Sequence, residues 1–193
     1  MAGSPKIAAI ILAAGRSTRM GDVNKLLADF DGRPMIAQTV AQVEASRLEQ
    51  IFVVTGHQAE EIEQALSGYQ VQFVDNRDFR QGMATSLVAG IGAVGSDFDG
   101  AMILLGDMPL VSGKEIDALV AAFSTAKDIC VPMFDGKQGN PVLWGKEYFP
   151  GLLNLVGDSG AKPLLARYAD AVVEVKTPSR AVLQDFDTAE AFP

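Results

Sequence analysis

The feature that most constrains this chain is the alternation of short apolar runs with segments of helical periodicity. Five runs rich in isoleucine, valine and leucine have the length of buried strands, and apolar residues recur between them at helical spacing, as at Ile36, Val40 and Val43. Successive βαβ units produce this order, and they build a mostly parallel sheet covered by helices. The expected strands are residues 7–12, 51–55, 71–74, 101–105 and 129–133.

Local signals mark where two of the expected helices begin. Ser112 stands before an apolar stripe over residues 116–123, and Glu115 follows it at the offset of a capping box. Pro34 follows a turn-forming Asp-Gly pair and is expected at the first position of the first helix. These signals concern structure and carry no chemistry.

The pattern is less regular after Pro141. A strand containing Trp144, a helix near residues 161–168 and a strand over residues 171–175 are expected there. The sequence has no repeat, low-complexity tract or charge block that would mark a linker. A single domain over residues 1–193 is therefore expected, with the last third as an addition to the sheet.

Composition excludes several classes of partner. The formal charge of −8 and the pI near 4.6 disfavour nucleic acid and anionic membranes, which bind basic surfaces. Cys130, the only cysteine, lies in an apolar run and is expected to be buried, which excludes an internal disulfide. No apolar stretch is long enough to span a membrane, so we expect a soluble, cytoplasmic protein.

The first expected strand runs into a segment typical of phosphate binding. Small residues follow Leu12 directly, so backbone N–H groups can approach an anion, and Arg16, Arg19 and Lys25 supply positive charge. The segment matches neither the Walker pattern nor the dinucleotide-binding glycine pattern. The alternative is an ordinary turn with surface arginines. In an open parallel sheet, ligands bind at the carboxyl ends of the strands, where this loop must lie.

Two aspartates are candidates for holding a metal beside that loop. Asp107 follows the strand over 101–105, and Asp187 lies near the end of the chain. A bare carboxylate about 4 Å from a phosphate charge costs on the order of 4 kcal/mol at an effective dielectric of about 20, so a nucleotide there requires a cation. Mg²⁺ is commonly held by one or two carboxylates plus phosphate oxygens. Each aspartate alone could instead be a turn or cap residue, which is the interpretation given to Asp97 and Asp99.

These segments together resemble the molybdopterin nucleotidyltransferase family, and in particular its molybdenum cofactor cytidylyltransferase-like branch. The resemblance covers nearly the whole chain and implies a Rossmann-like, three-layer α/β/α fold. Its motifs are LAAGRSTRMG at 12–21, NKLL at 24–27, VVTGH at 53–57, DNRDFRQGMATSL at 75–87, LLGDMPLV at 104–111, GNPVLW at 139–144, GDSGAKPLL at 157–165 and DFDTAEAF at 185–192.

The resemblance also implies roles for individual residues. Arg19, Lys25, Asp107 and Asp187 would be catalytic, with the two aspartates as ligands of Mg²⁺. The nucleotide would contact Leu12, Ala13, Ala14, Gly15, Arg16, Arg19, Lys25, Thr55, Gly56 and Asp107. The acceptor would contact Gly82, Met83, Thr85, Ser86, Gly139, Asn140 and Pro141.

Two positions depart from patterns common in the family. The guanylyl-transferring branch usually has glycine where Ala14 stands, so the alanine favours CTP. Relatives commonly have proline at the position of Ala189, which concerns the local turn and leaves Asp187 unchanged. His57, the only histidine, is interpreted as a surface or capping residue because it has no evident partner.

The implied reaction is attack by a terminal phosphate of the molybdenum pterin cofactor on the α-phosphorus of CTP, with release of pyrophosphate. A molybdenum hydroxylase is the client that would receive the product. Alternatives within the class are guanylyl transfer and transfer to a sugar phosphate. A non-catalytic chaperone for the pterin cofactor would leave Lys25 and the aspartates unexplained, and an NAD(P)-dependent oxidoreductase lacks its glycine fingerprint.

Overall fold

The computed structural model describes residues 4–16, 24–158 and 160–186. Its main strands are β1 (Ile7–Leu12), β4 (Gln50–Thr55), β5 (Gln72–Asp75), β6 (Gly100–Leu105), β7 (Ile129–Phe134), β9 (Val142–Gly145) and β10 (Val172–Lys176), with the two-residue strands β2 (Asp29–Phe30), β3 (Arg33–Pro34) and β8 (Lys137–Gln138). The α-helices are α1 (Met35–Glu44), α2 (Ala59–Ala65), α3 (Met83–Ala93), α4 (Gly113–Ala122), α5 (Phe149–Leu153) and α6 (Lys162–Arg167). Short 3-10 turns are η2 (Lys25–Leu27), η3 (Phe79–Gln81), η4 (Lys146–Tyr148), η5 (Ala169–Ala171) and η6 (Arg180–Leu183).

The central sheet is parallel except at β9 and the short β8. Its strand order is β10-β7-β9-β6-β1-β4-β5, with β8 added to β7. β1 pairs in parallel with both β4 and β6, and β10 pairs in parallel with β7. β9 runs antiparallel to β6 on one side and to β7 on the other. The carboxyl ends of β1, β4, β5, β6 and β7 therefore meet at one edge, together with the amino end of β9.

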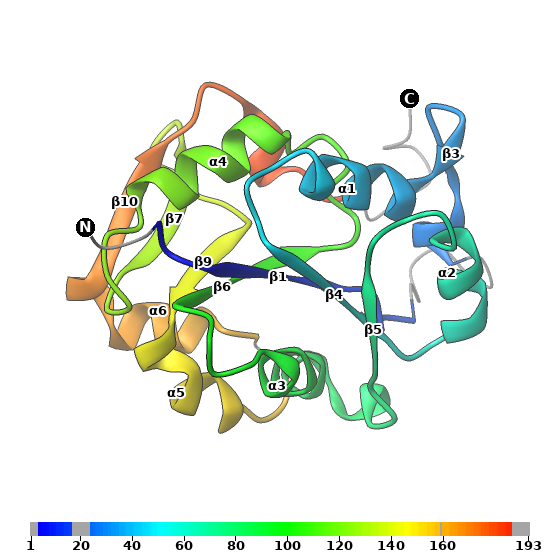
Figure 1. Cartoon of the computed structure of the whole chain (residues 1–193), viewed down its shortest axis with the longest axis horizontal. Helices are drawn as coiled ribbons and strands as arrows, with labels where there is room; N and C mark the ends of the chain where they lie inside the picture. Colours follow the sequence, from blue (N-terminus) through cyan, green and yellow to red (C-terminus); the bar gives the residue numbers. More distant parts are fainter. Residues whose placement is uncertain (1–3, 17–23, 159, 187–193) are drawn as a thin grey trace.

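Helices cover both faces of the sheet (Figure 1). Residues of α1, α2 and α4 pack with alternate residues of the strands on one face. The opposite core cluster contains residues of α3, α5 and α6 together with Ile10, Val54 and Trp144. Along β1 the side chains alternate between the two faces, with Ile11 in the first cluster and Ile10 in the second, as strand geometry requires. The three-layer α/β/α prediction is thus confirmed.

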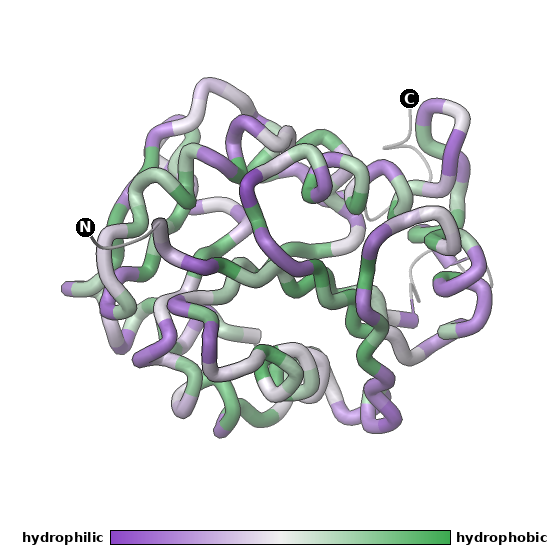
Figure 2. Tube along the Cα trace, in the orientation of Figure 1, coloured by the Kyte–Doolittle hydropathy of each residue, from purple (hydrophilic) through white to green (hydrophobic). Residues whose placement is uncertain are grey.

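Hydropathy follows these layers. The strands that cross the middle of the molecule are coloured as apolar, and polar colours concentrate in the peripheral loops and outer helix faces (Figure 2). β1 is almost wholly buried, as expected for a strand covered on both faces. Among the described residues, no helix has the length and apolar composition to cross a membrane.

Most expected elements are present close to their predicted limits. β1 has the predicted bounds, β4, β6 and β7 are each one residue longer at one end, and β5 is shifted by one residue toward the C-terminus. Ser112 and Glu115 form the predicted capping box at the start of α4. Cys130 is fully buried, and burial raises the pKa of its thiol to about 12. Pro34 is the exception, because it ends β3 and α1 begins one residue later at Met35.

Candidate nucleotide and acceptor site

The candidate site lies where the chain changes direction within the sheet. From β1 the chain continues to β4 and β5 on one side, and then returns to place β6 on the other side of β1. Such a switch point leaves a crevice at the carboxyl ends of the two diverging strands, here β1 and β6. The loop after Leu12 and the loop after Leu105 both begin at this point.

Backbone contacts hold the start of the loop after β1 against β4. The Ala13 N–H donates to Val54 O at 2.9 Å, and the His57 N–H donates to Ala14 O at 3.3 Å. A methyl group on Gly56 would lie 2.9 Å from the Ala14 Cβ, so the close approach requires glycine there. This packing places Ala14, which is 3% exposed, between the core and the site.

The loop after β6 is fixed in the same way. The Gly106 N–H donates to Leu12 O at 3.0 Å, and Gly106 O accepts a 2.9 Å hydrogen bond from the Thr39 hydroxyl on α1. A methyl group on Gly106 would lie 2.9 Å from the Ile36 side chain and 3.0 Å from Leu12 O. The glycine therefore lets β1, α1 and this loop meet, and the next residue, Asp107, is held at the crevice.

Lys25 and Asp107 form an ion pair across the crevice. The Lys25 Nζ donates to Asp107 Oδ2 at 2.5 Å, with side chains only 15% and 12% exposed respectively. Lys25 begins η2, whose first turn is capped by the Asn24 side chain accepting from the Leu26 N–H at 3.1 Å. The ion pair joins two residues that are 82 positions apart in the sequence. Lys25 was predicted to bind phosphate and Asp107 to bind a metal, and both lie at this crevice.

A cavity of about 530 Å³ opens over this ion pair. It is lined by the loop after β1, by Lys25 and Asp107, and by the segment that joins η3 to α3. The lining residues are Leu12, Ala14, Gly15, Arg16, Lys25, Leu26, Phe79, Arg80, Gly82, Met83, Ser86, Leu105, Gly106, Asp107, Asp158 and Asp185. We call it the nucleotide cavity.

The start of α3 is tied to a loop from the last third of the chain. The Met83 N–H donates to Asp158 Oδ1 at 3.0 Å, and the Ala84 N–H donates to Gly157 O at 3.1 Å. Gly82 has a φ of +111°, and a methyl group on it would lie 2.6 Å from Gly157 O. Glycine is therefore required at residue 82 both by its backbone conformation and by the space available.

The hydroxyl groups of this segment already have partners. The Thr85 hydroxyl donates to Gly82 O at 2.9 Å and accepts from the Asn76 side chain at 2.9 Å. The same Asn76 amide donates to the Ser86 hydroxyl at 3.0 Å. These bonds give Thr85 and Ser86 a structural task, so their contact with an acceptor stays a prediction.

A second cavity of about 650 Å³ adjoins the first and shares Leu105 and Asp185 with it. It lies toward α6 and β10 and contains two of the predicted acceptor residues, Gly139 and Asn140. Its lining residues are Leu105, Met108, Gln138, Gly139, Asn140, Val142, Lys162, Leu165, Ala166, Ala169, Val172, Glu174, Val182, Leu183 and Asp185. We call it the acceptor cavity. The remaining residue of the predicted motif, Pro141, lines a small neighbouring space beside α1 and α4 instead.

The structure brings the predicted residues together only in part. Gly82, Met83 and Ser86 line the nucleotide cavity and not the acceptor cavity, although all were predicted to contact the acceptor. Thr55 is completely buried at the end of β4 and lines neither cavity. Arg19 and Asp187 lie outside the described residues.

Other lining residues were not singled out by the sequence. In the nucleotide cavity these include Phe79 and Arg80, whose guanidinium lies 5.6 Å from the Phe79 ring centre, and Asp158. Asp185, two residues before the predicted metal ligand Asp187, lines both cavities. The sequence did offer one indication, because Arg80 and Asp158 lie within the motifs at 75–87 and 157–165.

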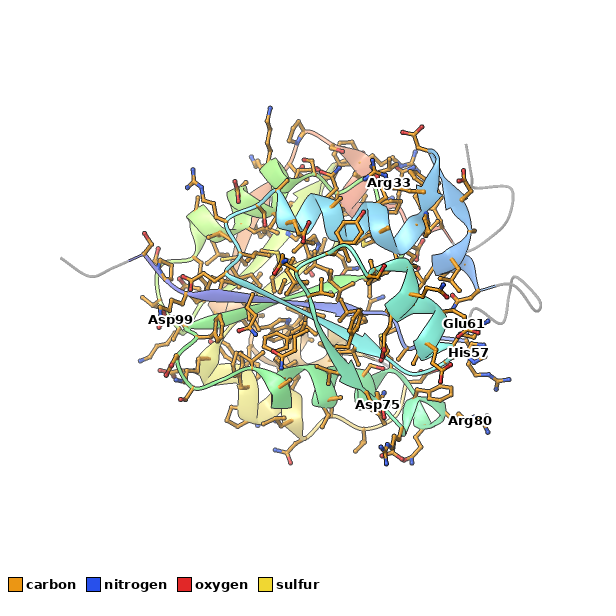
Figure 3. The ribbon with its side chains drawn as sticks, turned by 45° about the vertical axis from the view of Figure 1, so that its right-hand side comes forward. Arg33, His57, Glu61, Asp75, Arg80 and Asp99 are labelled. Atoms are coloured by element: carbon orange, nitrogen blue, oxygen red, sulfur yellow. The ribbon has the colours of Figure 1, made fainter. Side chains whose placement is uncertain are left out.

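Side chains at the two edges of the sheet differ in their relation to the site. His57 and Arg80 lie together at the edge where β1 and β4 end, whereas Asp99 lies at the opposite edge (Figure 3). Asp99 accepts from the Lys6 N–H at 2.9 Å, which agrees with its interpretation as a structural residue. The His57 ring lies 6.1 Å from the Phe79 ring, beside the cavity and not among its lining residues.

The residues present fit a divalent cation bound together with phosphate. Asp107 Oδ2 accepts from Lys25, while Oδ1 is buried without a hydrogen-bond partner among the described residues. A buried carboxylate oxygen of this kind requires a donor or a cation. No group of three or more metal-binding side chains gathers within residues 4–16, 24–158 and 160–186.

A mostly parallel sheet with cations and a carboxylate at its switch point is typical of α/β proteins that bind nucleotides. The match to a family model is specific. Residues 9–172 match the model described as the MobA-like NTP transferase domain, and the chain belongs to this family of nucleotidyltransferases.

Individual relatives agree with this assignment. The chain is 31% identical to the purine catabolism protein PucB of Bacillus subtilis, over 98% of this chain and 95% of that protein. It is 28% identical to the bifunctional protein GlmU of Desulfotalea psychrophila over 93% of this chain, and it spans only 52% of the length of that relative.

Solved structures share the fold. A nucleotidyl transferase from Methanothermobacter superposes with a TM-score of 0.85 and 28% identity, covering 96% of this chain and 94% of that one. A Mycobacterium tuberculosis protein solved in complex with manganese superposes with a TM-score of 0.75 and 23% identity, covering 91% and 89%.

Proposed function

We propose that this nucleotidyltransferase transfers CMP from CTP to the terminal phosphate of the molybdenum pterin cofactor and releases pyrophosphate. One observation carries the proposal. The nucleotide cavity, with its Lys25–Asp107 ion pair, adjoins the acceptor cavity, and the two share Leu105 and Asp185. Two substrates bound in adjoining cavities meet at the shared residues, as a direct transfer between them requires.

The nucleotide cavity has the charges that a triphosphate needs. Arg16, Lys25 and Arg80 line it, and the loop after β1 places Gly15 beside them. Arg19 belongs to the same loop by sequence and is assigned to the triphosphate with Lys25. Cationic side chains and backbone N–H groups together form the usual surroundings of a bound phosphate chain.

Asp107 and Asp187 are assigned to the divalent cation. The buried, unpartnered Oδ1 of Asp107 supports the assignment, and so does the manganese complex of a protein with the same fold. A bound Mg²⁺ neutralises phosphate charge and polarises the α-phosphoryl group. Without a cation, Asp107 would repel the triphosphate that Lys25 attracts.

The transfer itself needs positioning more than a protein base. An oxygen of the acceptor phosphate, already an anion, attacks the α-phosphorus of CTP in line. The new P–O bond forms as the bond between the α-phosphorus and the bridging oxygen breaks, and that oxygen leaves with pyrophosphate. Lys25 and Arg19 balance the charge that develops on pyrophosphate, so the role of Lys25 requires it to exchange Asp107 for a phosphate oxygen.

The choice of CTP depends on Ala14. Ala14 lines the nucleotide cavity, and its methyl group packs against Gly56. The guanylyl-transferring branch usually has glycine at this position, so the alanine supports CTP over GTP.

A sugar phosphate is the second candidate acceptor. Five polar side chains line the acceptor cavity, and hydroxyl groups pair with such side chains readily; they belong to Gln138, Asn140, Lys162, Glu174 and Asp185. Family members carry names as different as PucB and GlmU, so the acceptor has to be inferred from this cavity. A chaperone without catalysis would need no Lys25–Asp107 pair.

Product analysis tests the proposal. The protein is incubated with Mg²⁺, one of the four nucleoside triphosphates, and either isolated molybdenum cofactor or a hexose 1-phosphate, and the products are identified by mass. A cytidine–pterin dinucleotide with equimolar pyrophosphate is expected. A guanosine product or a nucleotide sugar would replace the proposed substrate, and cofactor binding without pyrophosphate release would indicate the chaperone.

A further inference from the structure

The acceptor cavity contains two charged side chains that the proposed reaction does not use. Lys162 is the first residue of α6, and Glu174 is the middle residue of β10. Both line the acceptor cavity, and neither lines the nucleotide cavity. They therefore belong to the part of the acceptor cavity that the nucleotide cavity does not share.

Strand geometry explains why Glu174 faces this cavity. Val173 and Val175 pack against the core cluster of α1 and α4, so Glu174 points to the opposite face of β10, as Val172 does. That face is covered by α6, which contributes Lys162 and Leu165 to the cavity wall.

The two charged groups are available to a ligand. Neither Lys162 nor Glu174 forms an ion pair or side-chain hydrogen bond with another of the described residues, and both are exposed. The wall around them is largely apolar, with Leu165, Val172 and Val182 among its residues. A few polar groups on an apolar wall are typical of sites that orient a flat organic ligand.

We propose that Glu174 and Lys162 recognise the 2-amino-4-oxopyrimidine edge of a pterin-type ring. This inference rests on the proposed function and names the recognition element of its acceptor. The Glu174 carboxylate accepts hydrogen bonds from the ring N3–H and from the exocyclic amino group, and the Lys162 ammonium donates to the ring carbonyl oxygen. The apolar wall contacts the faces of the ring, and the terminal phosphate extends toward Leu105, on the wall that the two cavities share.

The hydrogen-bonding pattern distinguishes a pterin from a sugar. A carboxylate only accepts, so it matches two adjacent N–H donors and rejects a carbonyl oxygen in place of one of them. A sugar hydroxyl both donates and accepts, so it tolerates an amide where a carboxylate stood. Exchange of the carboxylate for an amide therefore separates the two kinds of ligand.

The test is direct binding of two fluorescent rings to the full chain. The probes are 6-hydroxymethylpterin and lumazine, which has a second carbonyl in place of the amino group of a pterin. The wild-type protein is expected to bind the pterin at least about tenfold more tightly than lumazine. Glu174→Gln should reverse the preference, because the amide N–H can donate to the second carbonyl of lumazine. Lys162→Met should weaken the binding of both probes about five- to tenfold.

Controls separate this inference from the proposed function. Lys176→Met lies on the same strand outside the cavity and should bind both probes as the wild type does. Ala166→Trp fills the cavity wall and should remove pterin binding, while CTP binding measured by calorimetry stays unchanged. Equal affinity for the two probes, or an unchanged preference in Glu174→Gln, would overturn the recognition role even if CTP-dependent pyrophosphate release persists. If the wild-type protein did not bind CTP, the proposed function would be overturned instead.

Discussion

The two cavities are built in different ways, although they share a wall. The nucleotide cavity lies on the ends of adjacent parallel strands, and backbone hydrogen bonds at Ala13, Gly106 and Met83 hold its segments in place. The acceptor cavity gathers side chains from β8, β10, α6 and η6, and its charged groups Lys162 and Glu174 have no partner among the described residues. The comparison shows that backbone contacts fix the walls of the nucleotide cavity, whereas side chains from several elements form most of the wall of the acceptor cavity.

The largest effect is expected from Asp107→Asn. Loss of the carboxylate weakens the hold on the divalent cation, so turnover should fall about a thousandfold or more with every nucleotide and every acceptor. Pyrophosphate release measures it, and Asp97→Asn at the far edge is the matched control. A defect confined to one acceptor would contradict the division between the two cavities.

The next effect concerns Lys25→Met, which should act in opposite directions on two ligands. Affinity for CTP should fall about ten- to a hundredfold, because a buried cation is lost from the triphosphate site. Affinity of Mn²⁺ in the absence of nucleotide should rise about tenfold, because the ammonium at 2.5 Å no longer competes for Asp107. Direct titration of Mn²⁺ measures this, and weaker Mn²⁺ binding in the variant would exclude competition.

Gly82→Ala tests how firmly the nucleotide cavity is tied to the last third of the chain. A methyl group 2.6 Å from Gly157 O, at a φ of +111°, should cost about 2 kcal/mol of unfolding free energy. Chemical denaturation measures it. Gly92→Ala is the control inside α3, where no atom lies within 4 Å, and it should stabilise by about 0.5–1 kcal/mol. Similar changes in the free energy of unfolding for both variants would show that the contact between Gly82 and Gly157 contributes little to stability.

The smallest effect is expected at Cys130, which lies on β7 in the core cluster of α1 and α4. Burial raises the pKa of this thiol from 9.0 to about 12, so the folded protein keeps the proton that the unfolded chain loses. The protonated thiol contributes fully to the free energy of unfolding below pH 9, and this contribution decreases as the pH rises toward 12. Between pH 8 and pH 10, the free energy of unfolding of the wild type should decrease by about 1.4 kcal/mol more than that of Cys130→Ala. Parallel pH profiles for the two proteins would contradict this.

The nucleotide half could be predicted well because its signals are local. The apolar run of β1, the small residues after Leu12 and the capping box of Ser112 and Glu115 each specify structure within a few residues. The meeting of Lys25 and Asp107 followed from one general rule, that parallel strands present their carboxyl ends at one edge.

The acceptor half could not be predicted to the same depth, because its residues meet through the order and direction of strands. An apolar run such as Val142–Gly145 carries no sign that it runs antiparallel between β6 and β7. The position of Asp185 between the cavities, and that of Glu174 opposite α6, depend on that order. The tie between α3 and Asp158, which places Gly82, Met83 and Ser86 at the nucleotide cavity, likewise joins segments about 75 residues apart and leaves no local signal in the sequence.

The direction of β9 has a consequence for the acceptor cavity. Because β9 enters the sheet at the edge where its neighbours leave, the hairpin of β7 and β8, with Asp135 and Gly136 at its tip, leads directly into Gln138, Gly139 and Asn140 of that cavity. Changes in the hairpin therefore alter the wall that Gln138 contributes, while the strands that support Lys25 and Asp107 remain untouched.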